Sequence, residues 1–289
     1  MPALLAASSL ARALRKLHLL RAADPVEERY RGWSWHSSPV KPRYFVGLGV
    51  SEVAYRYCPT RRDLWLRRVR GLRGQPTEAM LKGRIVHEAF RLAARDLSRL
   101  VLGEGKSTED AVAELVGGAR ERASVILESA GIEGDGDGIA VFAARVYKKM
   151  VFAWAQWMEE TGAPPWITEY EVDGGLLGLS RRLRVDALAP GLVVEVKYGR
   201  WSRDYPVALA GYAMALEASL EIPFDYGLVI LVNGDGSRLT LEPVYIGNEE
   251  RAEFLTARDE AAEIVVSQVD PGRPPRCPDQ CPMRLVCAP

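Results

Sequence analysis

The chain has 289 residues, of which 48% are hydrophobic and 26% are charged, a composition typical of a globular protein. No apolar run reaches the roughly 20 residues of a membrane-spanning helix, which excludes an integral membrane protein and leads us to expect a cytoplasmic one. The 38 basic and 38 acidic residues cancel. This excludes a globally basic protein that coats nucleic acid, but it leaves room for a local basic patch.

Composition is uneven within these classes. Of the 38 basic residues, 31 are Arg and 7 are Lys, and Asn and Gln together number only 6. Few thermolabile amides and many ion-pair formers favour a thermophile, and a GC-rich genome explains the same bias equally well. Four cysteines in a chain of this length exclude a secreted disulfide scaffold.

The first part of the chain is predicted to be mainly helical. Residues 1–23 place Leu10, Leu14 and Leu17 at helical spacing and contain no acidic residue, which predicts an amphipathic helix. This helix packs on its own domain or, alternatively, serves as an organelle transit peptide. A proline-containing loop follows over residues 24–47. Further helices are expected over residues 61–70, 77–100, 107–130 and 138–161.

Short runs rich in Val, Ile, Leu and Tyr follow the helices and predict strands. The strands are expected over residues 166–173, 181–189, 192–198, 226–232 and 241–246, with helices over 204–221 and 249–268. Their order predicts an α/β core with a mixed central sheet, wrapped by helices. We divide the chain into an extension, 1–45, and one domain, 46–289, with a helical part 46–161, a sheet core 166–246 and a C-terminal helix with a Cys-rich tail 249–289.

Two acidic residues are expected to meet on a hairpin. Pro190-Gly191 is a turn signal between two apolar strands. Counting outward from this turn places Asp186 opposite Glu195, with Cβ atoms about 5 Å apart, and Lys197 points to the same face as Glu195. Two carboxylates this close repel each other, and a hard cation such as Mg²⁺ relieves that repulsion. The alternative is a surface face with a cross-strand ion pair.

His87 lies on the helix expected over residues 77–100, one turn after Gly83. Glycine inside a helix costs about 1 kcal/mol relative to alanine, and one reason to keep it is the close approach of another group beside the imidazole. Imidazole is a common ligand of transition metals. Together with the hairpin, this pattern favours a metal ligand over the alternative, an ordinary core or surface histidine.

The cysteines form a second pattern. Cys58 stands alone near the start of the domain, and Cys277, Cys281 and Cys287 close the chain as C-x(3)-C-x(5)-C. One plus three thiolates are the complement of a 4Fe–4S cluster. The alternatives are a Cys₄ zinc site, two disulfides as in some hyperthermophile proteins, or unrelated buried thiols.

The succession Gly-x-x-x-His, Asp and Glu-x-Lys resembles the RecB-like branch of the PD-(D/E)XK nuclease superfamily. The resemblance implies a PD-(D/E)XK core that cuts DNA phosphodiesters with Mg²⁺ or Mn²⁺. It also implies that His87, Asp186, Glu195 and the Val196 carbonyl bind the metal. By the same resemblance, Lys197 orients or activates the attacking water and stabilises the charge that develops on phosphorus.

The same branch usually carries Gln-x-x-x-Tyr on the helix after the hairpin. Tyr212 matches the tyrosine, which assigns it to the catalytic site by resemblance, and Ala208 stands at the glutamine position. The missing amide motivates an alternative function, a catalytically inactive DNA-binding subunit of a CRISPR complex.

Cys58-Pro59, followed far downstream by the three-Cys tail, resembles the iron–sulfur subset of RecB-like nucleases. A free-standing chain of this length resembles the CRISPR-associated Cas-four exonucleases, in their longer archaeal type I-A variant, over about residues 46–289. The resemblance implies a 4Fe–4S cluster, action on single-stranded DNA ends, processing of fragments for CRISPR spacer acquisition, and integrase proteins as partners. The alternative is the same chemistry in recombination or repair.

Basic residues gather where DNA is expected to bind. Residues 56–73 contain seven arginines and one aspartate, which favours a phosphate-binding groove over a solvated helix face. Trp201, Arg203 and Tyr205 combine cation and aromatic groups as single-strand binders do, unless Trp201 belongs to the core. The expected DNA contacts are Arg61, Arg62, Arg67, Arg68, Arg182 and Arg184.

Overall fold

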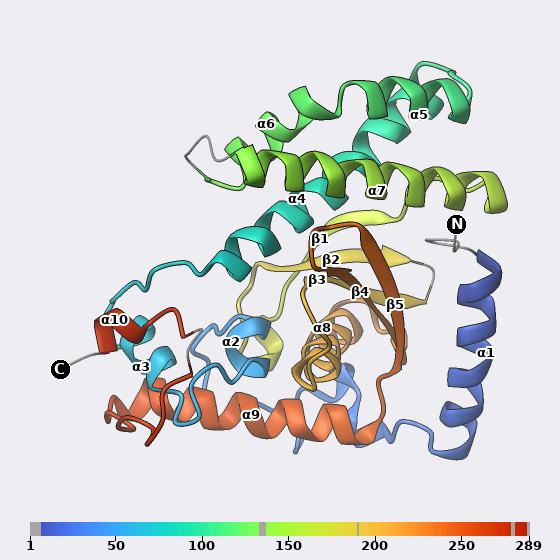
Figure 1. The fold of residues 1–289 in the computed structure, drawn as a ribbon. Helices are drawn as coiled ribbons and strands as arrows, with labels where there is room; N and C mark the ends of the chain where they lie inside the picture. Colours follow the sequence, from blue (N-terminus) through green and yellow to red (C-terminus); the bar gives the residue numbers. More distant parts are fainter. Residues whose placement is uncertain (1–6, 133–136, 190, 279–280, 288–289) are drawn as a thin grey trace.

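A computed structural model describes residues 7–132, 137–189, 191–278 and 281–287 of the chain. A five-stranded sheet crosses the molecule, with helices packed on both of its faces (Figure 1). Buried apolar side chains form one large cluster on each face, and a small third cluster lies at the C-terminal tail. The prediction of an α/β core with a mixed sheet wrapped by helices is therefore confirmed.

The sheet follows the chain order, with β3 and β4 parallel and the other neighbours antiparallel. The strands are β1 (Ile167–Val172), β2 (Leu183–Ala189), β3 (Leu192–Tyr198), β4 (Tyr226–Asn233) and β5 (Arg238–Tyr245). A parallel pair needs a crossover connection, and α8 (Asp204–Leu220) provides it. Most of β3 and β4 is buried, because helices cover both faces there; this explains their continuous apolar runs.

Two long helices, α4 (Glu78–Ser98) and α7 (Asp137–Thr161), pack against each other on one face of the sheet (Figure 1). α4 begins where expected because the Thr77 side chain accepts a hydrogen bond from Met80 N. A π-helical turn, Arg99–Gly103, follows α4. The single helix expected over 107–130 is in fact two, α5 (Thr108–Gly117) and α6 (Ala119–Ser129), because the two consecutive glycines lower the helix propensity.

The other face is covered by α8, by α9 (Asn248–Ser267) and by the short α2 (Val50–Ala54). A buried ion pair joins the two longer helices: Arg251 Nη1 lies 2.7 Å from Glu217 Oε2, and both side chains are fully buried. Arg31 and Asp225 join this pair. The N-terminal extension is thereby bound to the sheet core through charges that are almost entirely buried.

The N-terminal helix α1 (Ala7–Ala23) packs against β5 and the neighbouring end of α7 (Figure 1). Leu10 and Leu17 are buried in this contact. The expectation that this helix packs on its own domain is confirmed over these residues. Three short 3₁₀ turns, Glu28–Tyr30, Gly32–Ser34 and Gly175–Leu177, complete the connections.

The C-terminal tail returns to the start of the domain. Its short helix α10 (Arg284–Cys287) lies beside α3 (Arg62–Arg68) (Figure 1). Trp65 and Met283 are buried together there, and Trp65 Nε1 donates to Gln268 O over 2.9 Å. Within the part of the chain that the structure describes, no helix is both long enough and apolar enough to span a membrane.

Candidate active site

The hairpin brings the two predicted carboxylates together. β2 and β3 pair from Ala189–Leu192 to Ala187–Val194, so one further step sets Asp186 opposite Glu195, as counted from the turn; Pro190 of that turn lies outside the described residues. At this step the Asp186 side chain accepts the Val196 N–H, over 2.7 Å. The strand pairing thus ends at a carboxylate.

His87 reaches the same carboxylate from α4. Its Nδ1 lies 3.0 Å from Asp186 Oδ1, so Asp186 contacts β3 with one oxygen and α4 with the other. A Cβ placed on Gly83, one turn earlier, would meet no atom within 4 Å. The close approach that was expected at Gly83 is therefore not made by the described part of the protein, and the space beside this turn is open.

Lys197 completes the site from β3. Its ammonium forms an ion pair with Glu195 and lies 4.0 Å from Asp186 Oδ2. Glu195 is 2% exposed. Burial lowers the pKa of Lys197, but Glu195, with smaller effects from Tyr55 and Asp186, outweighs burial in sum and holds that pKa well above its usual value. The lysine is therefore a cation at neutral pH.

Burial and neighbouring charges also shift the pKa of the other three groups, His87, Asp186 and Glu195. Burial alone lowers the pKa of His87, but the adjacent Asp186 carboxylate raises it above its usual value. Burial raises the pKa of Asp186, yet His87, Lys197 and the Val196 N–H together bring it below its usual value. Burial raises the pKa of Glu195. Two adjacent carboxylates whose pKa values shift in opposite directions are typical of a functional site.

Glu169 on β1 is a member of the site that the sequence analysis missed. One ligand atom from each of His87, Glu169 and Asp186 lies within 4.8 Å of the others. Glu169 has a φ of +56°, an uncommon conformation for a residue with a side chain. The β1–β2 register sets it opposite Asp186. The neighbouring carboxylate and burial raise the pKa of Glu169, burial being the larger effect.

The alternation of side chains along β2 is interrupted at Asp186, so that residues before and after it point to opposite faces of the sheet. Leu183 and Val185 pack into the cluster beneath α8, whereas Ala187 and Ala189 pack into the cluster beneath α4 and α7. A regular strand would keep all four on one face. This shift lets Asp186 reach His87 on one side of the sheet and Lys197 on the other.

Two tyrosines border the lysine. The Lys197 ammonium lies 5.6 Å from the centre of the Tyr55 ring, within the range of a cation–π contact. Burial, together with Glu195, raises the pKa of Tyr55 and of Tyr212 well above the usual value. Ala208, one turn before Tyr212, is fully buried in the apolar cluster beneath the sheet. Tyr55 directly follows α2, and no spacing in the sequence linked it to the hairpin.

The donor set suits a hard divalent cation. Carboxylate oxygens and one imidazole nitrogen are ligands that Mg²⁺ and Mn²⁺ accept. Apart from the ion pair with Lys197, the buried Glu195 Oε2 has no hydrogen bond from the described residues, and such an atom is expected to have a partner. Among the predicted ligands, the compact group contains His87 and Asp186, with Glu169 as the third member. The ligand roles of Glu195 and of the Val196 carbonyl stay predictions.

The cysteines lie in one corner of the molecule. Arg62 Nη1 lies 3.2 Å from Cys287 Sγ, and Thr60, which contacts Cys58, donates to Gly272 O over 2.7 Å. Burial, with smaller effects from the Cys58 and Cys277 thiols, raises the pKa of Cys281. Among the described residues no three thiols lie within 4.8 Å of one another. A Cys₄ zinc site holds each sulfur about 2.3 Å from the metal, and the described thiols are not gathered that closely. The cluster stays a prediction.

One predicted DNA contact needs correction. Arg61 is 5% exposed, and its guanidinium donates to the carbonyls of Glu52 and Val53, so it stabilises the α2–α3 junction and does not face a strand. The other five arginines reach the surface but have acidic partners. Their partners are Asp270 for Arg62, Asp63 for Arg67, Glu52 for Arg68, Glu171 for Arg182 and Glu169 for Arg184.

Known proteins share this chain's whole length. Residues 4–289 match the family model described as CRISPR-associated exonuclease Csa1. The chain belongs to the Csa1 family. A CRISPR-associated exonuclease Csa1 from Thermoproteus tenax is 36% identical over 287 residues, which is 96% of this chain and 97% of the relative. One from Saccharolobus solfataricus is 29% identical over 282 residues, or 91% and 93% of the two chains.

Membership of the Csa1 family confirms the resemblance to CRISPR-associated nucleases that was drawn from the sequence motifs. The match includes the N-terminal residues from position 4, which the resemblance drawn from the motifs alone did not cover.

Proposed function

We propose that this chain is a metal-dependent deoxyribonuclease with a PD-(D/E)XK core, acting on single-stranded DNA ends. The observation that supports this most is the convergence of His87, Asp186, Glu195 and Lys197 around the middle of β2 and β3. The family name, CRISPR-associated exonuclease Csa1, supports the same class of reaction.

The residues divide the chemistry between them. Mg²⁺ or Mn²⁺, when bound by His87, Asp186 and their acidic neighbours, supplies Lewis-acid activation of a phosphate oxygen and of water. Asp186 keeps its orientation because its two oxygens contact different elements. Lys197 stays protonated, so it acts as a donor that orients water and stabilises charge developing on the phosphate, and it does not take a proton itself.

The biological role we propose is the processing of DNA fragments before their integration as CRISPR spacers, with integrase proteins as partners. The relatives named CRISPR-associated exonuclease support the CRISPR context. End processing in recombination or repair uses the same chemistry. An inactive DNA-binding subunit is favoured by one observation, the buried Ala208 at the position of the usual glutamine.

Cleavage assays separate these functions. Single-stranded, blunt and overhanging DNA labelled at either end is incubated with the protein in Mn²⁺ or Mg²⁺, beside Asp186→Asn. We expect metal-dependent shortening from single-stranded ends by the wild type and none by the variant. Binding without cleavage by the wild type would establish the inactive subunit. A substrate preference for branched or recombination-type ends would favour the repair role.

We also propose that Cys58, Cys277, Cys281 and Cys287 bind a 4Fe–4S cluster with a structural role. The location of these cysteines in one corner of the molecule supports this assignment. Anaerobically purified protein should be brown, with broad absorbance near ~400 nm and about four irons per chain. A colourless preparation with stoichiometric zinc would contradict it.

A further inference from the structure

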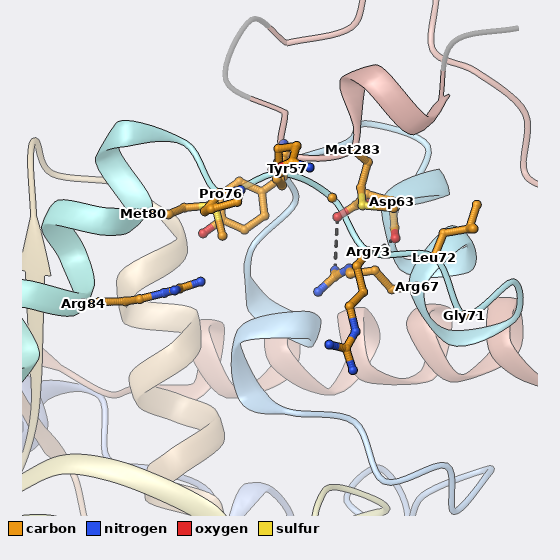
Figure 2. Close-up of a pocket in the computed structure, with 13 residues that line it drawn as sticks. Tyr57, Asp63, Arg67, Gly71, Leu72, Arg73, Pro76, Met80, Arg84 and Met283 are labelled. Carbon is orange, nitrogen blue, oxygen red and sulfur yellow. Dashed lines mark hydrogen bonds and ion pairs between the residues drawn. The ribbon is translucent and has the colours of Figure 1, made fainter. Parts of the chain in front are cut away.

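A cavity of about 480 Å³ lies between the α3–α4 connection, the start of α4 and the C-terminal tail (Figure 2). Arg73 lies on the connection and Arg84 projects from α4 towards it. Both are exposed, and neither has a hydrogen-bond or ion-pair partner among the described residues. Arg67, already paired with Asp63, adds a third guanidinium. The lining therefore carries excess positive charge.

The cavity wall is closely packed. Gln75 N donates to Pro282 O over 3.0 Å, and a Cβ on Gly74 would lie 2.3 Å from that same oxygen. Only glycine permits this approach of the connection to the tail. Because Pro282 directly follows Cys281, the cysteine corner sets the position of this wall.

Residues on two elements connect the cavity with the active site. Arg84 lies three residues before His87 on α4, so both lie on the same side of the helix. Tyr57, which lines the cavity and is 50% exposed, lies 5.9 Å from the Tyr55 ring, and Tyr55 borders Lys197. The aromatic series continues from Tyr55 through Tyr205 to Trp201.

Trp201 is 46% exposed, so the reading of this residue as core is wrong. Exposed aromatic rings beside unpaired arginines match what a single strand offers, since its bases stack on rings and its phosphates need cations. A duplex keeps its bases stacked inside, where Tyr57 cannot reach them. The chemistry of the lining thus favours a single strand.

We propose that this cavity is a binding subsite for the single DNA strand that leads to the active site. Arg73 and Arg84 neutralise its phosphates, and Tyr57 stacks on a base. This inference rests on the proposed nuclease function and adds the path of the strand. Neither arginine touches the metal-binding groups, so both act in binding and not in the chemical step.

The test measures binding without divalent metal, so that it does not depend on cleavage. A labelled oligothymidylate is titrated with wild type and with Arg73→Gln/Arg84→Gln over a series of salt concentrations. Each phosphate contact on a single strand contributes about 0.7 to the slope of log K against log salt, so loss of two contacts should lower the slope by about 1.4. Tyr57→Leu should weaken binding about tenfold with little change of slope.

The control is Arg12→Gln/Arg120→Gln, which removes two exposed arginines from α1 and α6 that have no partner among the described residues. Its slope should equal that of the wild type. An unchanged slope for the Arg73/Arg84 variant, or an equal loss in the control, overturns the subsite. A wild type that binds the strand but never cuts it in Mn²⁺ contradicts the nuclease function alone.

Discussion

The Val196 N–H donates a 2.7 Å hydrogen bond to Asp186 Oδ2, across two strands whose pairing ends one residue earlier. A side-chain carboxylate thus takes the place of a main-chain carbonyl in the ladder. The bond fixes one oxygen of Asp186 and leaves the other, Oδ1, directed at His87. A charged acceptor makes such a bond stronger than a neutral one, so the site is held by the sheet itself.

Lys197→Met should reduce cleavage about 100- to 1,000-fold, because it removes a preorganised cation from beside the phosphate. Binding of a single-stranded oligonucleotide without metal should change little. Single-turnover cleavage and anisotropy titrations on the same preparations measure the two quantities. The control is Lys106→Met, which removes an ion-paired lysine from the connection between the π-helical turn and α5. Cleavage by Lys197→Met at the wild-type rate would remove Lys197 from the active site.

Glu169→Gln should lower the affinity for the activating metal, because Glu169 lies in the compact group with His87 and Asp186. The Mn²⁺ concentration for half-maximal cleavage should rise about tenfold or more. Glu171→Gln, two residues along the same strand and half exposed, should leave it unchanged. Identical Mn²⁺ titrations for both variants would show that Glu169 is not a ligand.

Gly83→Ala should stabilise the fold yet impair cleavage. The added methyl meets no atom of the described protein, and alanine is favoured over glycine inside a helix by about 1 kcal/mol. Because the open space adjoins His87, we expect a raised KM for DNA. Chemical unfolding and steady-state cleavage test the two effects, with Gly117→Ala on α5 as the control for helix stability. A variant more stable than wild type with unchanged KM would show that no substrate enters this space.

Cys58→Ser should harm the fold more than the chemistry. The proposed cluster then loses its only ligand from the N-terminal part of the domain, and the contact of α3 with the tail rests on side chains such as Trp65 and Met283 alone. We expect loss of iron and a Tm lower by about 10 °C or more, with residual Mn²⁺-dependent cleavage at low temperature. Thr60→Val removes the hydrogen bond to Gly272 O and the hydroxyl contact with Cys58 Sγ but keeps all four thiols, so it should cost about 1 kcal/mol while iron is retained. Equal melting curves for Cys58→Ser and wild type would refute the structural role.

Asp225 should make stability depend on pH in the acid range. Burial raises its pKa, but hydrogen bonding and attraction from Arg31 lower it below the usual value. The unfolded chain therefore binds its proton at a higher pH than the folded one, so this contribution is complete above about pH 4 and is lost as pH falls further. Urea unfolding between about pH 3 and pH 6 should show a shallower dependence for Asp225→Asn. Glu253→Gln, exposed on α9, is the control, and an unchanged slope in Asp225→Asn would contradict the assignment.

Much of this molecule is determined by local sequence. The register of Asp186 opposite Glu195 follows from a short turn, because a tight hairpin leaves few ways to pair its strands. The alternation of side chains then directs Lys197 to the face of Glu195. The position of His87 one turn after Gly83 follows from the helical repeat alone.

Only the tertiary structure decided which further side chains lie beside the hairpin carboxylates, Lys197 and His87. Glu169 arrives from β1 across a long connection, which does not set register as a short turn does. Tyr55 and Tyr57 come from a segment without periodicity, so no pattern placed them beside Lys197. Arg61 is buried and Arg73 is not, although both belong to the same basic run. The sequence shows how many arginines this segment has. The packing of α2, α3 and the tail decides which guanidiniums donate to buried carbonyls and which stay accessible to a ligand.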